Sequence, residues 1–423
     1  MGRRIWWVAG FALAVVLAGA AACGLKGPCN AANCPGCCDA SGACQGGSTA
    51  NACGLDGNGC VECAATQACQ IGVCTLVSGS SCATGSCPDG GGGGGGGASG
   101  NRADGTLGAW AVVTPMPVPR ANHCSAAAGQ FLLVAGGNYK PAGGSSFVSV
   151  DDIHSASVAE DGTLGAWTLA GKLPSPGTDC VLAVSGTTVV LLGGLFDTAA
   201  LDGDVWTTTL ALNGTLGTWQ LVGTLPYGRR ALGVGAETKA GKVLLSDAAL
   251  VSETNEAVLA LATLGNPLGS WTKTQYWPQF RGKPSLAFTD AAAFFLGGYD
   301  GTNAVLSDVT GIPLDADGAP GTPVATTALP AGRTFGAAAG ADDYVFNFGG
   351  RDQLFGVAPQ ANVISAKASG ASLGPWTAQA PLPEPRSNHT ATVVGDFVFI
   401  LGGGNNGPGL DAVYRAQIRH PVH

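Results

Sequence analysis

The feature that most constrains the fold of this chain is a short segment, ending in tryptophan, that recurs about every 50 residues. Its copies are Gly105–Trp110, Gly162–Trp167, Gly214–Trp219, Asn266–Trp271 and Ala371–Trp376. The tryptophans lie 57, 52, 52 and 105 residues apart, so the last interval spans two periods and holds a sixth copy, in which Pro323 replaces tryptophan. A period of this length indicates a propeller or a repeat array rather than one globular core.

Two further columns keep the same frame. Ten residues after each tryptophan position lie Arg120, Gly177, Arg229, Arg281, Arg333 and Arg386. A glycine pair follows 26 and 27 residues after it in five copies, as Gly136–Gly137, Gly193–Gly194, Gly297–Gly298, Gly349–Gly350 and Gly402–Gly403. The third copy has Leu245–Ser246 instead. Residues 105–423 are therefore six copies of one unit.

Each unit reads as four short strands. In the first, Ser125–Ala128, Phe131–Val134, Asp152–Val158 and Trp167–Ala170 are separated by turn residues, a pattern typical of antiparallel hairpins. Four antiparallel strands per repeat predict the blade of a β-propeller. We expect an all-β fold in which the N-terminal strand at Trp110–Thr114 completes the last blade, since that blade lacks its own fourth strand.

The glycine pair, the tryptophan and the arginine before the next unit together resemble the kelch repeat. The resemblance covers residues 105–423 and implies a six-bladed kelch-type β-propeller, with departures at Leu245–Ser246, Pro323 and Gly177. The glycines would permit sharp turns and close backbone approach, and the tryptophan would supply an apolar surface between blades.

Residues 1–22 read as an export signal, with Arg3–Arg4 followed by an apolar run too short to span a membrane comfortably. Cys23 follows a small-residue segment, which resembles a bacterial lipoprotein signal and implies lipidation of Cys23. Ordinary signal-peptidase cleavage is the alternative. The chain is therefore predicted to be exported, either as a lipoprotein of the cell envelope or as a secreted protein.

Residues 23–89 form a cysteine-rich segment with twelve cysteines between Cys29 and Cys87. In an exported chain this indicates a disulfide framework, since the segment has few large apolar residues with which to build a core. Cys34–Cys37 and Cys60–Cys63 have zinc-ligand spacing, but no histidine lies nearby. Residues 90–104, which begin with eight glycines, are predicted to be a flexible linker to the propeller.

Cys124 and Cys180 stand apart from that segment, near the innermost strands of units one and two. They lie fourteen and thirteen residues after their tryptophan positions. Because neighbouring residues of a strand face opposite ways, this offset predicts a disulfide across the interface between the two units.

The loops between second and third strands differ in every unit and are the candidate ligand-binding face, because function concentrates on variable loops held by a rigid scaffold. Their recognition residues are Tyr139, Phe147, Phe196, Tyr299, Asp300, Arg351, Asp352, Phe355, Asn405 and Asn406. The arginine column, Arg120, Arg229, Arg281, Arg333 and Arg386, is expected to form a ring on the same face. Hydrogen bonding between blades or ligand binding would account for it.

A catalytic alternative comes from galactose-oxidase-type enzymes, which carry copper on a kelch-type propeller through two tyrosines and two histidines. His123 and His389 occupy matching Arg–x–Asn–His sequences in neighbouring units. No matching tyrosine or cysteine accompanies them, so we interpret them as part of the repeat and predict no metal and no cofactor.

The preferred interpretation is an exported, surface-anchored, non-catalytic binding module whose partner is a protein or a glycan at the cell surface. A secreted carbohydrate-active enzyme of the oxidase type is the alternative. A net charge of −8 with 11% charged residues argues against a nucleic-acid partner, and contact with a membrane is expected only through a lipid on Cys23.

Overall fold

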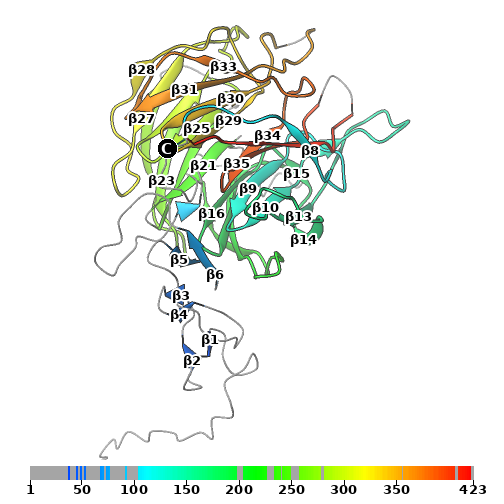
Figure 1. Ribbon diagram of the computed structural model, residues 1–423, viewed down its shortest axis with the longest axis vertical. Helices are drawn as coiled ribbons and strands as arrows, with labels where there is room; N and C mark the ends of the chain where they lie inside the picture. Colours follow the sequence, from blue (N-terminus) through cyan, green and yellow to red (C-terminus); the bar gives the residue numbers. More distant parts are fainter. Residues whose placement is uncertain are drawn as a thin grey trace, which may run out of the picture.

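The computed structural model describes residues 103–420, with gaps at 198–202, 226–232, 240, 249–256, 278–280, 355 and 405–407, together with short strands between residues 37 and 92. Every regular element in this described part is a β-strand, and the larger sheets are arranged around a common centre (Figure 1). Within the same residues, no helix has the length and apolar composition needed to cross a membrane. Cys23 and the predicted signal lie outside the described residues.

Six sheets contain at least four strands each. Sheet 1 contains β9 (Cys124–Ala128), β10 (Phe131–Ala135), β13 (Asp152–Ser157) and β14 (Thr168–Lys172). Sheet 2 contains β16 (Val181–Ser185), β17 (Thr188–Leu192), β19 (Asp204–Thr209) and β20 (Gln220–Thr224). Sheet 3 contains β21 (Gly233–Lys239), β22 (Lys242–Ala248), β23 (Ala257–Thr263) and β24 (Thr272–Trp277).

Sheet 4 contains β25 (Ser285–Thr289), β26 (Ala292–Leu296), β27 (Val309–Pro313) and β28 (Val324–Thr326). Sheet 5 contains β29 (Ala337–Ala341), β30 (Tyr344–Phe348), β31 (Val363–Ser369), β32 (Ser372–Leu373) and β33 (Thr377–Gln379). Sheet 6 contains β34 (Thr390–Val394), β35 (Phe397–Leu401), β36 (Val413–Gln417) and β8 (Ala111–Val113).

The remaining strands form short pairs or extend a sheet. Near the N-terminus, β1 (Cys37–Cys38) pairs with β2 (Cys44–Gln45), β3 (Ser48–Thr49) with β4 (Ala52–Cys53), and β5 (Gln67–Gln70) with β6 (Val73–Leu76). In the loops, β11 (Asn138–Tyr139) pairs with β12 (Val148–Ser149), and β15 (Gly177–Thr178) with β18 (Leu195–Phe196). Inside the predicted glycine linker, β7 (Gly91–Gly92) pairs with β16.

The innermost strands make the arrangement a β-propeller. They contact one another in the cyclic order β9, β16, β21, β25, β29, β34 and back to β9, and Figure 1 shows them around the centre. The ring closes through β8, which pairs antiparallel with β36 and aligns Val113 with Val413. The predicted completion of the last sheet by the N-terminal strand is therefore confirmed.

The hydrophobic core is divided among the interfaces between consecutive sheets. Leu133 of β10 and Leu191 of β17 are fully buried in the cluster that joins sheets 1 and 2. Leu132, the preceding residue, packs with Phe399 in the cluster that joins sheets 1 and 6. Successive side chains of a strand point to opposite faces, so a strand covered on both faces must be continuously apolar. This explains why runs such as Phe131–Ala135 show no polar alternation.

The repeated Gly–Thr–Leu–Gly segment forms the turn between the third and fourth strands. The Asp161 carboxylate accepts a hydrogen bond from the backbone N–H of Thr163 at 2.8 Å. In the next unit the side-chain oxygen of Asn213 accepts one from the backbone N–H of Thr215 at 3.1 Å. The glycine between them has a positive φ, 75° at Gly162, a conformation that a residue with a side chain adopts only under strain.

The five repeated tryptophans tie five of the six sheets to the preceding one around the ring; sheet 4 has Pro323 at this position. Each indole N–H donates to a backbone carbonyl at the end of the outer strand of the preceding sheet, in the pairs Trp110–Ala380, Trp167–Thr114, Trp219–Lys172, Trp271–Thr224 and Trp376–Thr327. The distances are 2.7–3.1 Å. The tryptophan therefore supplies a directed hydrogen bond between sheets in addition to the apolar contact expected from the sequence.

A covalent link joins sheets 1 and 2 near the axis. Cys124 and Cys180 form the expected disulfide, with their Cα atoms 5.6 Å apart and a sequence separation of 56. Both residues are buried in the cluster shared by the two sheets.

The closing role of β8 can be tested by two truncations. A chain that begins at residue 115 lacks β8 and leaves the edge of β36 unpaired, whereas a chain that begins at Ala103 retains it. We expect the shorter chain to aggregate and to unfold at lower temperature, because an unpaired strand edge exposes free N–H and C=O groups. Light scattering and thermal unfolding would measure both effects, and equal behaviour of the two chains would contradict the closing role.

Candidate binding face at the central axis

In five of the six sheets, one residue enters the innermost strand in a left-handed conformation. These residues lie twelve positions after the tryptophan position: Asn122 (φ 54°), Asp179 (55°), Lys283 (46°), Phe335 (56°) and Asn388 (56°). The corresponding residue of sheet 3, Ala231, lies outside the described residues. A bulky residue such as phenylalanine at positive φ is uncommon, and such conformations cluster at ligand sites because the surrounding structure must enforce them.

Among the described residues, four backbone hydrogen bonds join these five positions in series and help to enforce the conformation. The N–H of Asp179 donates to Asn122 O at 2.8 Å, and that of Asn122 donates to Asn388 O at 3.0 Å. The N–H of Asn388 donates to Phe335 O at 2.8 Å, and that of Phe335 donates to Lys283 O at 3.4 Å. Because the innermost strands surround the axis, this series of bonds frames one end of it. We call these five residues the axial ring.

The axial ring presents charged and aromatic side chains side by side. Lys283 forms an ion pair with Asp179 across the position of sheet 3. Phe335 stacks on Tyr299, with ring centroids 6.2 Å apart and an interplanar angle of 29°. Burial raises the pKa of Tyr299, and the Asp179 carboxylate adds to the effect, so the phenol stays protonated and able to donate a hydrogen bond. Aromatic surface beside fixed polar groups is a combination used in ligand recognition.

Tyr299 and Arg351, both predicted from the sequence, occupy the same repeat position directly after the glycine pair. Each forms a backbone bridge with the residue just before an axial-ring residue: Tyr299 with Gly282, and Arg351 with Thr334. The Arg351 side chain donates to Ser387 Oγ at 3.1 Å and to the Val357 carbonyl at 2.8 Å. It therefore anchors its own loop to sheet 6 while lying beside the axial ring.

The other predicted loop residues divide into three groups. Phe147 is 59% exposed, Asp352 is exposed, and Tyr139 is half-buried in the β11–β12 hairpin. Asp300 accepts the N–H and hydroxyl of Thr302 and the N–H of Ala304, so it shapes its own turn. Phe355, Asn405 and Asn406 lie outside the described residues, as does Arg229 of the arginine column.

Phe196 is not on the exposed face. It is only 7% exposed, and a Cβ placed on Gly177 would meet its ring at 2.4 Å. Gly177 stands where four described sheets have arginine, so Phe196 fills the space beside that missing side chain. The sequence prediction was wrong here because it could not see that glycine in the arginine column leaves a gap for a neighbouring loop.

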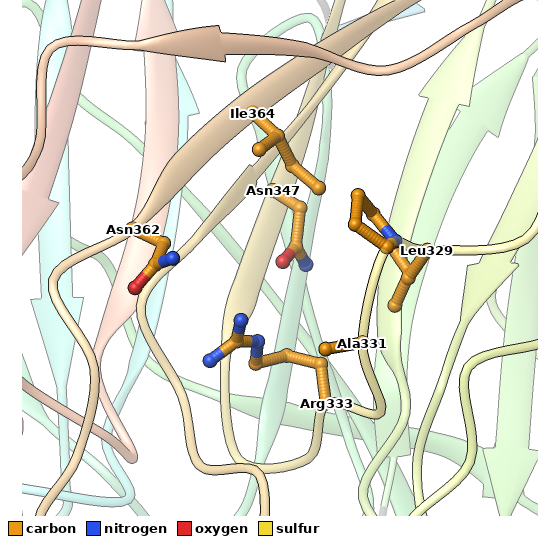
Figure 2. A pocket seen from close by; sticks show the side chains of 7 residues that line it. Leu329, Ala331, Arg333, Asn347, Asn362 and Ile364 are labelled. Carbon is orange, nitrogen blue, oxygen red and sulfur yellow. The ribbon is translucent and has the colours of Figure 1, made fainter.

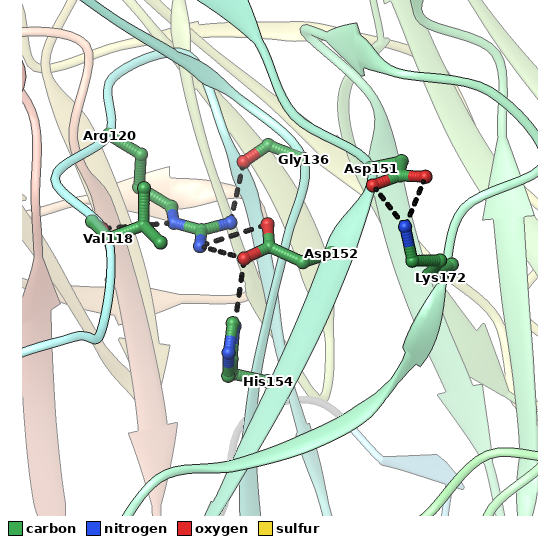
Figure 3. Close-up of polar contacts among 7 residues, drawn as sticks. All are labelled: Val118, Arg120, Gly136, Asp151, Asp152, His154 and Lys172. Atoms are coloured by element: carbon green, nitrogen blue, oxygen red, sulfur yellow. Dashed lines mark hydrogen bonds and ion pairs between the residues drawn. The ribbon is translucent and has the colours of Figure 1, made fainter. Parts of the chain in front are cut away.

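The arginine column does not form an exposed ring. Arg120 and Arg386 are fully buried and Arg281 is 8% exposed. Each donates from Nη1 to the carbonyl of the first glycine sixteen residues later, at 2.7–2.9 Å. Figure 3 shows Arg120 between the Gly136 carbonyl and the Asp152 carboxylate, which lies 3.1 Å from Nη2.

The backbone of the same column links sheets. In four of the five glycine pairs, the second glycine donates its N–H to the carbonyl at the arginine position of the next sheet: Gly137–Gly177, Gly298–Arg333, Gly350–Arg386 and Gly403–Arg120. The residue at the arginine position after the remaining pair, Arg229, lies outside the described residues. At this column the backbone makes the hydrogen bonds between sheets, whereas the guanidinium groups of Arg120, Arg281 and Arg386 act within a sheet.

His123 and His389 are wedged against the glycine pairs. A Cβ on Gly402 would lie 2.9 Å from the His123 ring, and one on Gly349 would lie 3.0 Å from the His389 ring. His123 Nε2 is 3.0 Å from Thr390 Oγ1. Burial lowers the pKa of His123 well below its ordinary value, with Arg120 and His389 adding to the effect. Burial and, to a lesser extent, Arg386 lower the pKa of His389 to about 3. A contact with the Phe348 backbone acts in the opposite direction and raises the pKa.

Within the described residues, no three histidine, cysteine, aspartate or glutamate side chains come together as metal ligands. The two histidines do lie close enough to influence each other, as their matching positions suggested. By themselves they do not supply the ligand set that the resemblance to galactose-oxidase-type enzymes implies.

The sequence analysis identified none of the five residues of the axial ring. It selected Tyr299, which stacks on Phe335, but not Asp179, Lys283 or Phe335. The signal was available as the column two residues after the arginine column, in which residue type changes from one unit to the next. Its left-handed backbone could not be read from residue types that rarely adopt it.

Comparison with known proteins supports the fold. No protein-family model matches the chain. A Kelch-like protein, terF, from Aspergillus terreus is 28% identical over 138 residues, which cover 32% of this chain and 30% of that relative. The solved structure of YjhT aligns with a TM-score of 0.53 at 12% identity, covering 71% of this chain and 95% of that one. The chain is therefore a β-propeller with partial sequence similarity to a Kelch-like protein.

The buried ion pair of Arg120 can be tested against an exposed one nearby. Replacing Arg120 by methionine leaves the Asp152 carboxylate without its cation, so we expect a loss of about 3–5 kcal/mol in unfolding free energy. Lys172 pairs with Asp151 at 3.0 Å but is 64% exposed, and Lys172→Met should cost about 0–1 kcal/mol. Urea unfolding measures both, and equal losses would contradict a structural role for Arg120.

The neutral histidines predict a pH dependence. The unfolded chain takes up protons on histidine below about pH 6.5, whereas folded His389 resists protonation down to about pH 3. As the pH is lowered below about 6.5, this group should therefore reduce the unfolding free energy by up to about 1.4 kcal/mol per pH unit. Urea unfolding between about pH 6.5 and 4.5, above the ordinary range of carboxylates, should show a shallower slope for His389→Gln. An unchanged slope would contradict the assignment.

Proposed function

We propose that this protein is an exported, surface-anchored binding module of the kelch type. In this proposal each of the six sheets is one kelch blade, and the axial ring with its neighbouring loops holds a protein or glycan ligand. The observation that carries it is the series of backbone hydrogen bonds that joins five sheets at the axis and presents asparagine, aspartate, lysine or phenylalanine side chains from them. A fixed frame with variable side chains is how repeat folds commonly build recognition surfaces.

The chemistry of the axial ring supports recognition rather than bond cleavage or transfer. The stacked pair of Tyr299 and Phe335 offers an apolar face, and the pair of Lys283 and Asp179 offers fixed charges beside it. Aromatic residues and fixed hydrogen-bond donors suit the apolar faces and hydroxyl groups of sugars, and they also suit the anchor residues of a peptide loop.

The N-terminal part of the sequence supports display at a surface. An apolar signal that ends at Cys23, a segment with twelve cysteines and a glycine linker precede the propeller. A lipid on Cys23 would hold the chain to a membrane, the cysteine-rich segment would act as a stalk, and the linker would let the propeller face its ligand.

The repeat itself provides a matched variant for testing the axial ring. Phe335→Asn removes the stacked aromatic side chain but installs the residue that occupies the same left-handed position in sheets 1 and 6, and asparagine tolerates this conformation. The propeller should therefore fold while ligand binding weakens by tenfold or more, as expected for loss of an aromatic anchor. The binding assay uses a broad glycan array and cell-envelope extract in parallel.

The control is Leu169→Thr, at a residue that is 57% exposed on the outer strand β14, remote from the axis. A ligand whose binding is reduced by Phe335→Asn and not by Leu169→Thr would support the axial ring as the site. A ligand that binds both variants as well as the natural chain would exclude it.

A further inference from the structure

A small cavity lies where sheet 4 connects to sheet 5. Its volume is about 80 Å³, enough for a few water molecules or one small polar group. Leu329, Pro330 and Ile364 form its apolar wall, and Arg333, Asn347 and Asn362 supply its polar groups. Figure 2 shows the guanidinium group of Arg333 lying between the two asparagine side chains.

Arg333 belongs to the arginine column, but its setting differs from that of Arg120 and Arg281. Those two meet the carboxylates of Asp152 and Asp308. Each of these aspartates also accepts, through its backbone carbonyl, the N–H of the first glycine in the glycine pair of its own sheet. This backbone bond identifies the equivalent position in the other sheets. In sheet 5 the same position is Asn362, which accepts the N–H of Gly349 at 2.9 Å. The repeat has therefore kept the cation and replaced its carboxylate by a neutral amide.

Among the described residues, no hydrogen bond or ion pair is made by the guanidinium group of Arg333. Nη1 is buried and has no hydrogen bond among the described residues. Asp352 acts on it electrostatically but forms no ion pair with it in the described part of the chain. A buried donor without an acceptor is costly, and more so when it carries charge. An acceptor that enters the cavity would remove that cost.

The other polar groups suit the same acceptor. Asn347 is 2% exposed and donates from Nδ2 to the Ala337 carbonyl at 3.3 Å, so one N–H of its amide remains for a ligand. Asn362 lies exposed at the rim, where its amide can also donate. Arginine presents parallel N–H groups that match the two oxygens of a carboxylate.

We propose that this cavity binds the carboxylate group of a small ligand, in place of the aspartate that the equivalent positions of sheets 1 and 4 provide. The guanidinium balances a single negative charge, and the two amides add neutral hydrogen-bond donors. The nearby Asp352 carboxylate disfavours a second one, so a monoanionic carboxylate is preferred over a phosphate dianion. This inference concerns a pocket distinct from the axial ring and does not depend on that ring binding a ligand.

The repeat again supplies the decisive substitution. Asn362→Asp introduces the carboxylate that sheets 1 and 4 have at this position. This carboxylate should form an ion pair with the Arg333 guanidinium and so compete with any ligand. Acetate and formate, titrated separately into the full chain, should shift the NMR signal of the Arg333 guanidinium and raise the thermal midpoint, and inorganic phosphate should do so less. Asn362→Asp should abolish both responses to acetate and should itself raise the midpoint in the absence of ligand.

The control is Asn303→Asp, which makes the same change of charge at an exposed loop residue of sheet 4; it should leave the acetate response unchanged. Arg333→Gln should also lose the response. Three results would overturn the proposal: no saturable response to acetate or formate in the natural chain, an undiminished response in Asn362→Asp, or an equal loss in Asn303→Asp. A stronger response to phosphate than to acetate would overturn the assignment to a carboxylate.

Discussion

The hydrogen bond from the second glycine of each pair to the head of the next sheet is the contact on which the rest of the structure depends. It requires two consecutive residues at positive φ, such as Gly136 (60°) and Gly137 (90°), and it leaves no room for a Cβ, since one on Gly137 would meet the Ala121 carbonyl at 2.8 Å. Only glycine satisfies both conditions. The bond sets the distance between neighbouring sheets at the axis, as the tryptophan bond does at the periphery.

Once these two bonds fix the stacking of sheets, the residues between them can change from one unit to the next, and the changes are informative. The arginine column keeps its cation in sheets 1 and 4 with an aspartate partner. In sheet 6, Arg386 lies 4.4 Å from the ring centroid of Tyr414, where Ala412 replaces the aspartate. In sheet 2 the cation is absent and burial raises the pKa of the remaining Asp204. Among the arginines of the column that the structure describes, Arg333 of sheet 5 alone has neither a carboxylate ion-pair partner nor an aromatic ring over it.

The sequence was sufficient to predict the elements that repetition reveals. The strand content, the closing strand before Thr114 and the bridge between Cys124 and Cys180 all follow from spacing within a fixed frame, because a frame of six units predicts which residues face one another. Burial was harder to predict. The arginines were expected to form a ring on the loop face, through hydrogen bonds between blades or through ligand binding. A charged residue can instead be fully buried when a carbonyl and a carboxylate satisfy it, and neither partner is near it in sequence. Phe196 was misplaced for a related reason, since its position depends on the absence of a side chain at Gly177.

The closed ring also determines how specificity can arise at the axis. Widening the axial ring would require breaking its backbone bonds or separating β8 from β36, and the disulfide between Cys124 and Cys180 restrains sheets 1 and 2 further. Ligand recognition must then come mainly from the side chains on the frame and from the loops outside it, rather than from movement of whole sheets. A preformed frame lowers the entropic cost of binding. It also means that one substitution at a ring position, such as phenylalanine in place of asparagine at residue 335, changes the binding surface without altering the scaffold that holds it.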